Sequence, residues 1–258
     1  MSPPRELGRV AAGALARVYF DVSYELLAGS AAGRRLLALT AAGDEPVHGY
    51  FTVDDRDLLQ AELDPRPHDR LLDLGCGVGG IALEVHRRTG AQVVGVDVSP
   101  RAIAAATRRA RRAGAGAAVR FVVGDLARPP LVGATSAYAI DSLMFLPDLV
   151  GTLRGIGEAL GPGGCLFATL LVVGPDGAAR LDRSLRAAGV RVERTDDVTA
   201  ALDARSRARA AAARALLRDR ATTPRGSLAT LLVLAEEALV RAMIARGRLS
   251  RWRFVVRY

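Results

Sequence analysis

The short stretch LLDLGCGVGG combines an acid with closely spaced glycines, and it carries the clearest chemical signal in the chain. Gly75, Gly77 and Gly80 satisfy the GxGxxG spacing of dinucleotide-binding loops. The same stretch also reads Asp73-x-Gly75-x-Gly77-x-Gly79, with a carboxylate two residues before the first glycine. That carboxylate would repel a pyrophosphate and attract a cation, such as the ammonium of an amino-acid tail. We therefore expect a ligand with a positive end, and the absence of lysine excludes a phosphate-binding P-loop.

The segments around this loop alternate between β-rich and helical patterns, which predicts an α/β fold with a parallel sheet. One helix is sharply delimited, with Ser99 as its N-cap, Pro100 at its first position and Gly114 at its exit. From about residue 199 to 247 the pattern is helical throughout, in two pieces separated near Pro224. We predict strands at 70–75, 92–98, 119–125, 136–143, 165–173, 190–194 and 251–258, and shorter helices at 80–90, 99–114, 147–164 and 180–189.

Four motifs over residues 71–170 together resemble those of class I methyltransferases that depend on S-adenosylmethionine (SAM). They are the DxGxGxG loop, the acid in GVDVS, the VVGDL segment and the ALGPGG turn. In that family they wrap the methionyl part of SAM, hold its ribose hydroxyls, meet its adenine and precede the fifth strand, respectively. The cofactor-binding residues that the resemblance implies are Asp73, Gly75, Gly77, Gly79, Asp97, Val98, Gly124, Asp125, Leu126, Asp141 and Ser142.

The resemblance also implies a fold and a division of the chain. The fold is a Rossmann-like seven-stranded sheet with helices on both faces, an antiparallel last strand and a helical lid inserted between the last two strands. The expected parts are an N-terminal helical arm that closes over the cofactor (1–65), the SAM-binding core (66–198), the lid (199–247) and the last strand of the core (248–258).

The N-terminal segment resembles the aromatic arm of small-molecule methyltransferases, through Tyr19-Phe20-Asp21 and His48-Gly49-Tyr50-Phe51. We expect Tyr19 and Tyr50 to close over the cofactor, because an aromatic ring beside a sulfonium gains roughly 0.5–2 kcal/mol of cation–π attraction. The alternative is that both tyrosines only anchor a docking helix.

Methyl transfer is an in-line displacement that requires alignment and exclusion of water but no nucleophilic residue. Many family members carry a histidine after strand four, where this chain has Met144 and Phe145, so Asp141 is the only titratable side chain of that stretch. The segment DSLMF resembles one in prenyl-diphosphate C-methyltransferases, where an acid removes a proton from a carbocation. Asp141 is thus a candidate base, or it only contacts the cofactor or ends the strand.

The net charge of +9 comes from arginine alone, and the arginines are scattered on helices among alanines. We attribute this charge to composition bias and do not expect nucleic acid as a partner. In the predicted lid, Arg205, Arg207, Arg209, Arg214 and Arg218 would clamp an anionic group or face water.

Two cysteines outside any metal-binding spacing fit a reducing cytoplasm, and no apolar run long enough to span a membrane is present. The sequence thus predicts a cytoplasmic, SAM-dependent methyltransferase of a small molecule, plausibly in specialised metabolism, that releases S-adenosylhomocysteine. We expect no metal, with Mg²⁺ required only if the acceptor is a diphosphate, and the chain is a possible homo-oligomer. The alternatives are N- or O-methylation of an amine, sugar or phenol, RNA methylation, and a SAM-fold protein that transfers no methyl group, such as a cyclase.

Overall fold

The computed structural model describes residues 27, 30–39, 49–130, 133–219 and 223–258. Its centre is one seven-stranded sheet with the strand order β3-β2-β1-β4-β5-β7-β6. Strand β7 is antiparallel to both of its neighbours, β5 and β6, whereas the remaining pairs are parallel. The strands are β1 (Arg70–Leu74), β2 (Gln92–Asp97), β3 (Val119–Val123), β4 (Ser136–Ile140), β5 (Cys165–Val173), β6 (Arg191–Asp197) and β7 (Leu249–Arg257).

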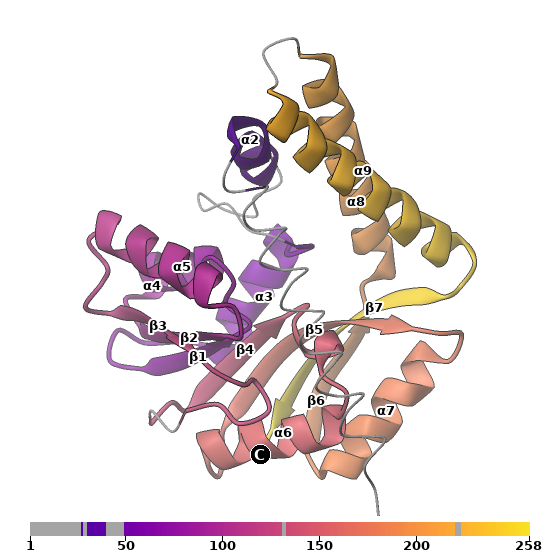
Figure 1. Cartoon of the computed structure of the whole chain (residues 1–258). Helices are drawn as coiled ribbons and strands as arrows, with labels where there is room; N and C mark the ends of the chain where they lie inside the picture. The colour runs from indigo at the N-terminus through magenta and orange to yellow at the C-terminus, as the bar shows by residue number, and fades with distance from the viewer. Residues whose placement is uncertain (1–26, 28–29, 40–48, 131–132, 220–222) are drawn as a thin grey trace, which may run out of the picture.

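Helices cover both faces of this sheet (Figure 1). One face is covered by α3 (Val53–Leu63), α4 (Gly80–Thr89) and α5 (Pro100–Arg112). The other face is covered by α6 (Leu149–Leu160) and α7 (Gly177–Ala188), and a short 3-10 helix, η1 (Leu143–Phe145), follows β4. The predicted α/β fold, a seven-stranded Rossmann-like sheet between two helical layers, is confirmed.

Strand alternation divides the core between the two faces. Neighbouring side chains of a strand point to opposite sides of the sheet, so Leu71 packs with α3 and α4 while Leu72 packs with α6 and α7. Strand β5, which reads CLFATLLVV, is buried along all but its last residue because it lies inside a sheet covered on both faces.

The helix termini follow the predicted capping chemistry. Ser99 accepts a hydrogen bond from the Ala102 backbone N–H at the start of α5, and Pro100 occupies the first turn. Helix α3 begins with a capping box in which Thr52 and Asp55 each accept from the other's backbone N–H. These caps fix where α3 and α5 begin, which is at the edge of the sheet that carries the glycine loop.

Two long helices, α8 (Thr199–Arg218) and α9 (Pro224–Ala245), run between β6 and β7 and are called the inserted hairpin below. They rise from the same side of the sheet as α3, and α2 (Ala31–Leu39) packs against them (Figure 1). Leu36 and Leu37 of α2 join Leu216 of α8 and Val233 of α9 in a small separate core. The break near Pro224 is where α9 begins, with Thr223 as its N-cap.

Candidate active site

The glycine loop lies between β1 and α4 at the carboxyl ends of the parallel strands. Gly75, Gly77 and Gly79 all have positive φ, at +83°, +51° and +79°, where side-chain-bearing residues are strained. The N–H groups of Gly75 and Cys76 donate to the Val96 carbonyl oxygen at 2.8 and 3.1 Å, which ties the loop to the end of β2. A Cβ on Gly75 would lie 2.3 Å from the Cβ of Ser142, so the neighbouring strand also requires glycine here.

Asp73 is buried beside this loop and keeps one carboxylate oxygen unused. Its side chain is 2% exposed, and Oδ2 has no hydrogen-bond partner among the described residues. Burial raises the pKa of Asp73 to about 8; the Tyr138 hydroxyl, a potential donor, opposes this rise and the nearby Asp97 charge adds to it. A buried acceptor without a partner is costly unless a ligand satisfies it, and a cation would also restore its charge.

Asp97, at the end of β2, bridges the glycine loop and the start of α5. Its Oδ2 accepts from the Gly77 N–H and its Oδ1 from the Ser99 N–H, each at 2.9 Å. Ser99, and not Asp97, supplies the side-chain cap of α5. Val98 follows with 45% of its side chain exposed, so the surface next to Asp97 is open to a ligand.

The segment after β3 completes the same edge of the sheet. Gly124 donates to the Asp97 carbonyl oxygen at 3.0 Å, and exposed Asp125 accepts from the Ala127 N–H at 2.9 Å. Leu126 is half-buried, and its Cδ1 lies 3.6 Å from where a Cβ on Gly75 would stand. The structure therefore places the VVGDL segment next to the glycine loop.

Two further predicted residues, Asp141 and Ser142, follow β4 directly. Ser142 donates from Oγ to the Leu74 carbonyl oxygen at 2.6 Å, which links the ends of β4 and β1. Asp141 adopts a positive φ of +51°, and its N–H donates to Thr169 on β5. Because the carboxyl ends of β1, β2, β3 and β4 meet at one edge, the described part of the predicted cofactor set lies together.

The Asp141 carboxylate belongs to a buried ionic chain that sequence reasoning missed. Its Oδ1 accepts from Nε of Arg251 at 2.9 Å, and Arg251, which is fully buried on β7, also donates from Nη1 to Asp55 at 2.9 Å. Arg253 donates to the other oxygen of Asp55 at 3.2 Å and pairs with Asp196. One signal was available: in RWRFVVRY the arginines alternate along a strand, so Arg251 and Arg253 share a face.

Within this chain, one acceptor and one donor are left over. Asp141 Oδ2 and Arg251 Nη2 are both buried, and neither has a partner in the described part of the chain. A carboxylate held by a guanidinium is stabilised as an anion, which suits a binding or positioning group better than a free proton acceptor. The role of Asp141 as a base stays a prediction.

Tyr50 lies between the core and the inserted hairpin, whereas Tyr19 is outside the described residues. Its hydroxyl donates to Glu237 of α9 at 3.2 Å, and the Arg209 guanidinium of α8 stands 5.3 Å from the centre of its ring. Arg209 is itself buried, paired with Glu237, and bonded to the Gly49 carbonyl oxygen at 3.3 Å. Burial is the main reason that the pKa of Tyr50 lies far above its ordinary value.

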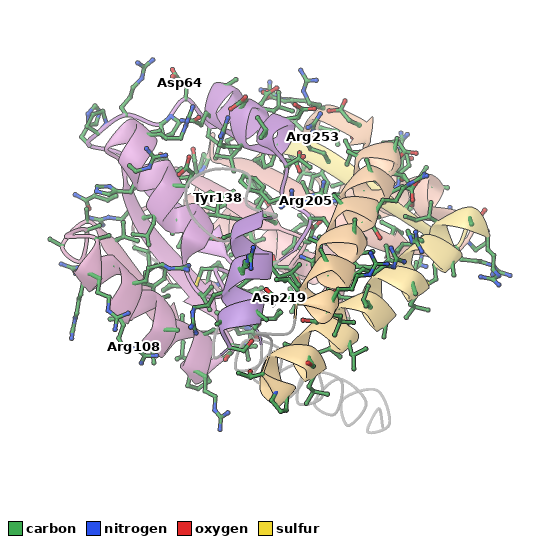
Figure 2. The ribbon with its side chains drawn as sticks, turned by 90° about the horizontal axis from the view of Figure 1, so that it is seen from above. Asp64, Arg108, Tyr138, Arg205, Asp219 and Arg253 are labelled. Carbon is green, nitrogen blue, oxygen red and sulfur yellow. The ribbon has the colours of Figure 1, made fainter. Side chains whose placement is uncertain are left out.

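A second arginine of the hairpin, Arg205, faces the same region. Figure 2 shows it on the side of α8 nearest Tyr138 and Arg253. Burial lowers the pKa of Arg205 to about 10, the charges of Arg209 and Arg251 lower it further, and Asp55 and Asp141 counteract them. The expectation that lid arginines face water holds for exposed Arg207 but not for Arg209, which is 2% exposed.

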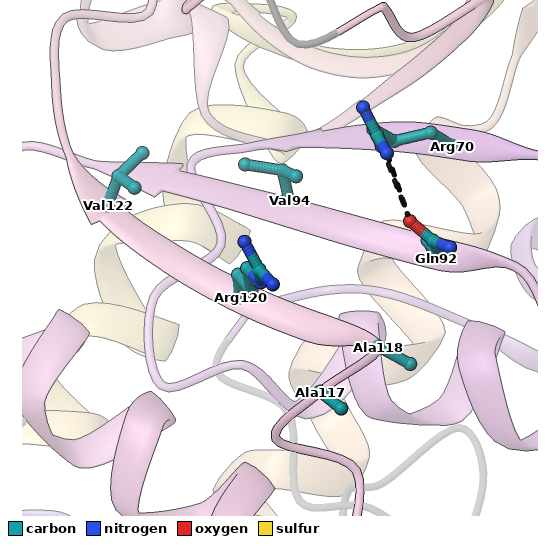
Figure 3. A pocket seen from close by; sticks show the side chains of 7 residues that line it. All are labelled: Arg70, Gln92, Val94, Ala117, Ala118, Arg120 and Val122. Atoms are coloured by element: carbon teal, nitrogen blue, oxygen red, sulfur yellow. Dashed lines mark hydrogen bonds between the residues drawn. The ribbon is translucent and has the colours of Figure 1, made fainter.

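A separate cavity of about 280 Å³ lies at the opposite edge of the sheet (Figure 3). Arg70 and Gln92, which line it, are the first residues of β1 and β2, and a hydrogen bond of 3.3 Å joins them. Since the glycine loop leaves the other end of β1, this cavity is not part of the candidate site.

In the part of the chain that the structure describes, no helix is both long enough and apolar enough to cross a membrane.

The sheet order, the loop after β1 and the acid after β2 define a class I methyltransferase fold, and comparison with known proteins agrees. A family model described as "Methyltransferase domain" matches residues 71–164. Sterol 24-C-methyltransferase erg6 of Aspergillus fumigatus is 40% identical over 97 residues, which are 37% of this chain and 26% of that protein. The chain thus spans about a quarter of the length of the first curated relatives that it matches.

Two solved structures resemble the chain over most of its length. The [4+2]-cyclase SpnF has a TM-score of 0.68 and 26% identity, with 91% of this chain and 93% of that chain covered. Geranyl diphosphate C-methyltransferase from Streptomyces coelicolor A3(2) has a TM-score of 0.63 and 19% identity, with 80% and 78% covered, and shows the fold alone. By its family and its fold, the chain belongs with the class I SAM-dependent methyltransferases that act on small molecules.

Proposed function

We propose that this protein transfers a methyl group from SAM to a small-molecule acceptor. The observation that carries the proposal is the unpartnered, buried Asp73 Oδ2 beside a loop of three positive-φ glycines. An acid in that place suits the ammonium of a methionyl tail and is unfavourable for a pyrophosphate. The family match over residues 71–164 supports the same reading.

The residues present fit SAM as the cofactor. Asp73 would hold the ammonium, and Asp97 would accept from the ribose hydroxyls with the lone pairs that Gly77 and Ser99 leave over. Asp125 and Leu126 would meet the adenine, beside Gly124 and Val98. When bound, SAM supplies a methyl group on a positively charged sulfur, which is transferred by displacement and leaves S-adenosylhomocysteine.

This chain's own contribution to the reaction is alignment and exclusion of water. The inserted hairpin, held to the core by Tyr50, Arg209 and Glu237, would serve as the lid over the acceptor. Asp141, with Arg251 behind it, would orient the acceptor or the cofactor. If the acceptor is a prenyl diphosphate, Asp141 would instead take a proton as the base, and Mg²⁺ would accompany the diphosphate.

A second candidate function is cyclisation without methyl transfer. It is favoured by the similarity to SpnF, whose title names a [4+2]-cyclase and which matches nearly the whole chain at 26% identity. The two functions differ in one product, because only methyl transfer releases S-adenosylhomocysteine. N- or O-methylation of a small amine, sugar or phenol and methylation of RNA differ from the leading proposal in the acceptor alone.

The test uses SAM with a labelled methyl group, incubated with the protein and an extract of its source cells. Separate aliquots are treated with nuclease or protease and then extracted with solvent. Label that survives both treatments and enters the small-molecule fraction supports the proposal. Label destroyed by nuclease assigns RNA as the acceptor, and a failure to form S-adenosylhomocysteine with any fraction favours cyclisation. Asp73→Asn is the matched control and should abolish the signal.

A further inference from the structure

Helix α9 presents an apolar face to the outside of the protein. At 3.6 residues per turn, seven of its residues fall within one third of the helix circumference. Leu228, Leu231 and Leu239 are 56%, 52% and 61% exposed. We call this set the α9 outer stripe; it consists of Leu228, Leu231, Leu232, Ala235, Ala238, Leu239 and Ala242.

The opposite side of the same helix is polar where it is buried. Thr230 and Glu237 point into the protein with 1% and 0% exposure. A helix that lies on a globular core ordinarily turns its leucines inward and its polar residues outward. The reversed distribution on α9, extending over about four turns, indicates a surface that another apolar surface covers.

We propose that a second copy of this chain covers the α9 outer stripe, with the two α9 helices antiparallel about a two-fold axis. The bulky residues of the stripe gather in its first half and the alanines in its second half. In an antiparallel pair, the leucines of one helix therefore meet mainly the alanines of the other, so the stripe is complementary to itself, as a two-fold interface requires. Ala235 is the midpoint between Leu228 and Ala242, where a small residue allows close approach of the helices.

Charge distinguishes this occupant from an anionic membrane. The chain carries +9, so two copies repel each other and approach most easily along an uncharged face. No charged residue lies in the stripe between Pro224 and Arg246, in a chain with 36 arginines. The exposed Arg207 belongs to the other helix of the hairpin. The hairpin also projects beyond the sheet (Figure 1), which leaves room for a partner along α9.

The test is a cross-linking experiment with Ala235→Cys in the full chain. Cys76 and Cys165 are both buried, so the new thiol is the accessible one among the described residues. Mild oxidation should convert most of this variant to a disulfide-linked dimer, because the two thiols face each other near the axis. The matched control is Ala211→Cys, at an exposed position of α8 outside the stripe, and it should stay mostly uncross-linked.

Sedimentation of the unmodified protein supplies an independent readout. We expect twice the chain mass of 27.2 kDa, and we expect Leu231→Glu to weaken the dimer at least tenfold while Val173→Glu, at an exposed β5 position, does not. A monomer at micromolar concentration with no cross-linking of Ala235→Cys overturns the proposal. So does a monomer that co-sediments with vesicles of phosphatidylglycerol but not of phosphatidylcholine, which would assign the stripe to a membrane.

Discussion

Binding of the cofactor should be coupled to the release of a proton, because Asp73 is buried and has no opposite charge beside it. With a pKa of about 8, only about one tenth of the Asp73 side chains are ionised at pH 7 before a ligand arrives. An ammonium group binds the ionised form, so binding at pH 7 should release close to one proton. Over the same range the dissociation constant should fall as pH rises, by roughly 50-fold between pH 6 and pH 8.

Isothermal titration calorimetry with S-adenosylhomocysteine measures both quantities. The observed enthalpy, determined at pH 7 in buffers of different ionisation enthalpy, gives the number of protons released. Asp73→Asn removes the titrating group but keeps its shape, so it should bind at least tenfold more weakly at pH 8 and release no proton. Any titration of the ligand itself persists in this variant and can be subtracted.

The sign of the accompanying stability change also follows from the raised pKa. A folded-state pKa above the unfolded value means that the folded protein retains a proton that the unfolded chain loses, so stability without ligand falls as pH rises from about 4 to 8. Asp73→Asn should raise the unfolding temperature of the ligand-free protein at pH 8 more than at pH 5. A wild-type protein whose affinity is independent of pH, with no proton release, would refute the reasoning about Asp73.

Three other substitutions test the geometry of the site. Gly75→Ala should lose most S-adenosylhomocysteine binding in calorimetry and lower stability by about 2 kcal/mol or more, because φ is +83° and the new Cβ meets Ser142; unchanged affinity would contradict this. Arg251→Met should cost about 3–5 kcal/mol in urea unfolding because it leaves two buried carboxylates unpaired, whereas Arg257→Met, which removes an exposed pair on the same strand, should cost less than about 1 kcal/mol; equal losses would refute the difference. Tyr50→Phe should cost about 1–3 kcal/mol and loosen the inserted hairpin, detected as faster amide exchange in α9; unchanged exchange would show that this bond does not hold the hairpin.

Most of the fold could be predicted because local signals and tertiary structure agree. Strand β5 and helix α5 begin where the sequence indicates, since a nine-residue apolar run and a Ser-Pro cap each leave little choice. The insertion of two helices before an antiparallel last strand was also predicted, from the end of the β–α alternation and from the resemblance to the family.

The ionic contacts of the site could not be predicted, because they join residues far apart in the chain. Asp55 reads from the sequence as an ordinary helix-capping acid, and its contacts with Arg251 and Arg253 exist only once α3 lies against β7. The buried Arg209–Glu237 pair is hidden in the same way, because in a chain with 36 arginines no single one stands out. Composition thus concealed the residues that hold the hairpin.

The most direct test of the account is a crystal structure of the protein with S-adenosylhomocysteine. We expect the ligand at the carboxyl ends of β1 and β2, with its amino group hydrogen-bonded to the Asp73 carboxylate and its ribose hydroxyls on Asp97. Binding in the cavity beside Arg70 and Gln92, or a bound ligand that makes no contact with Asp73, would contradict the central claim.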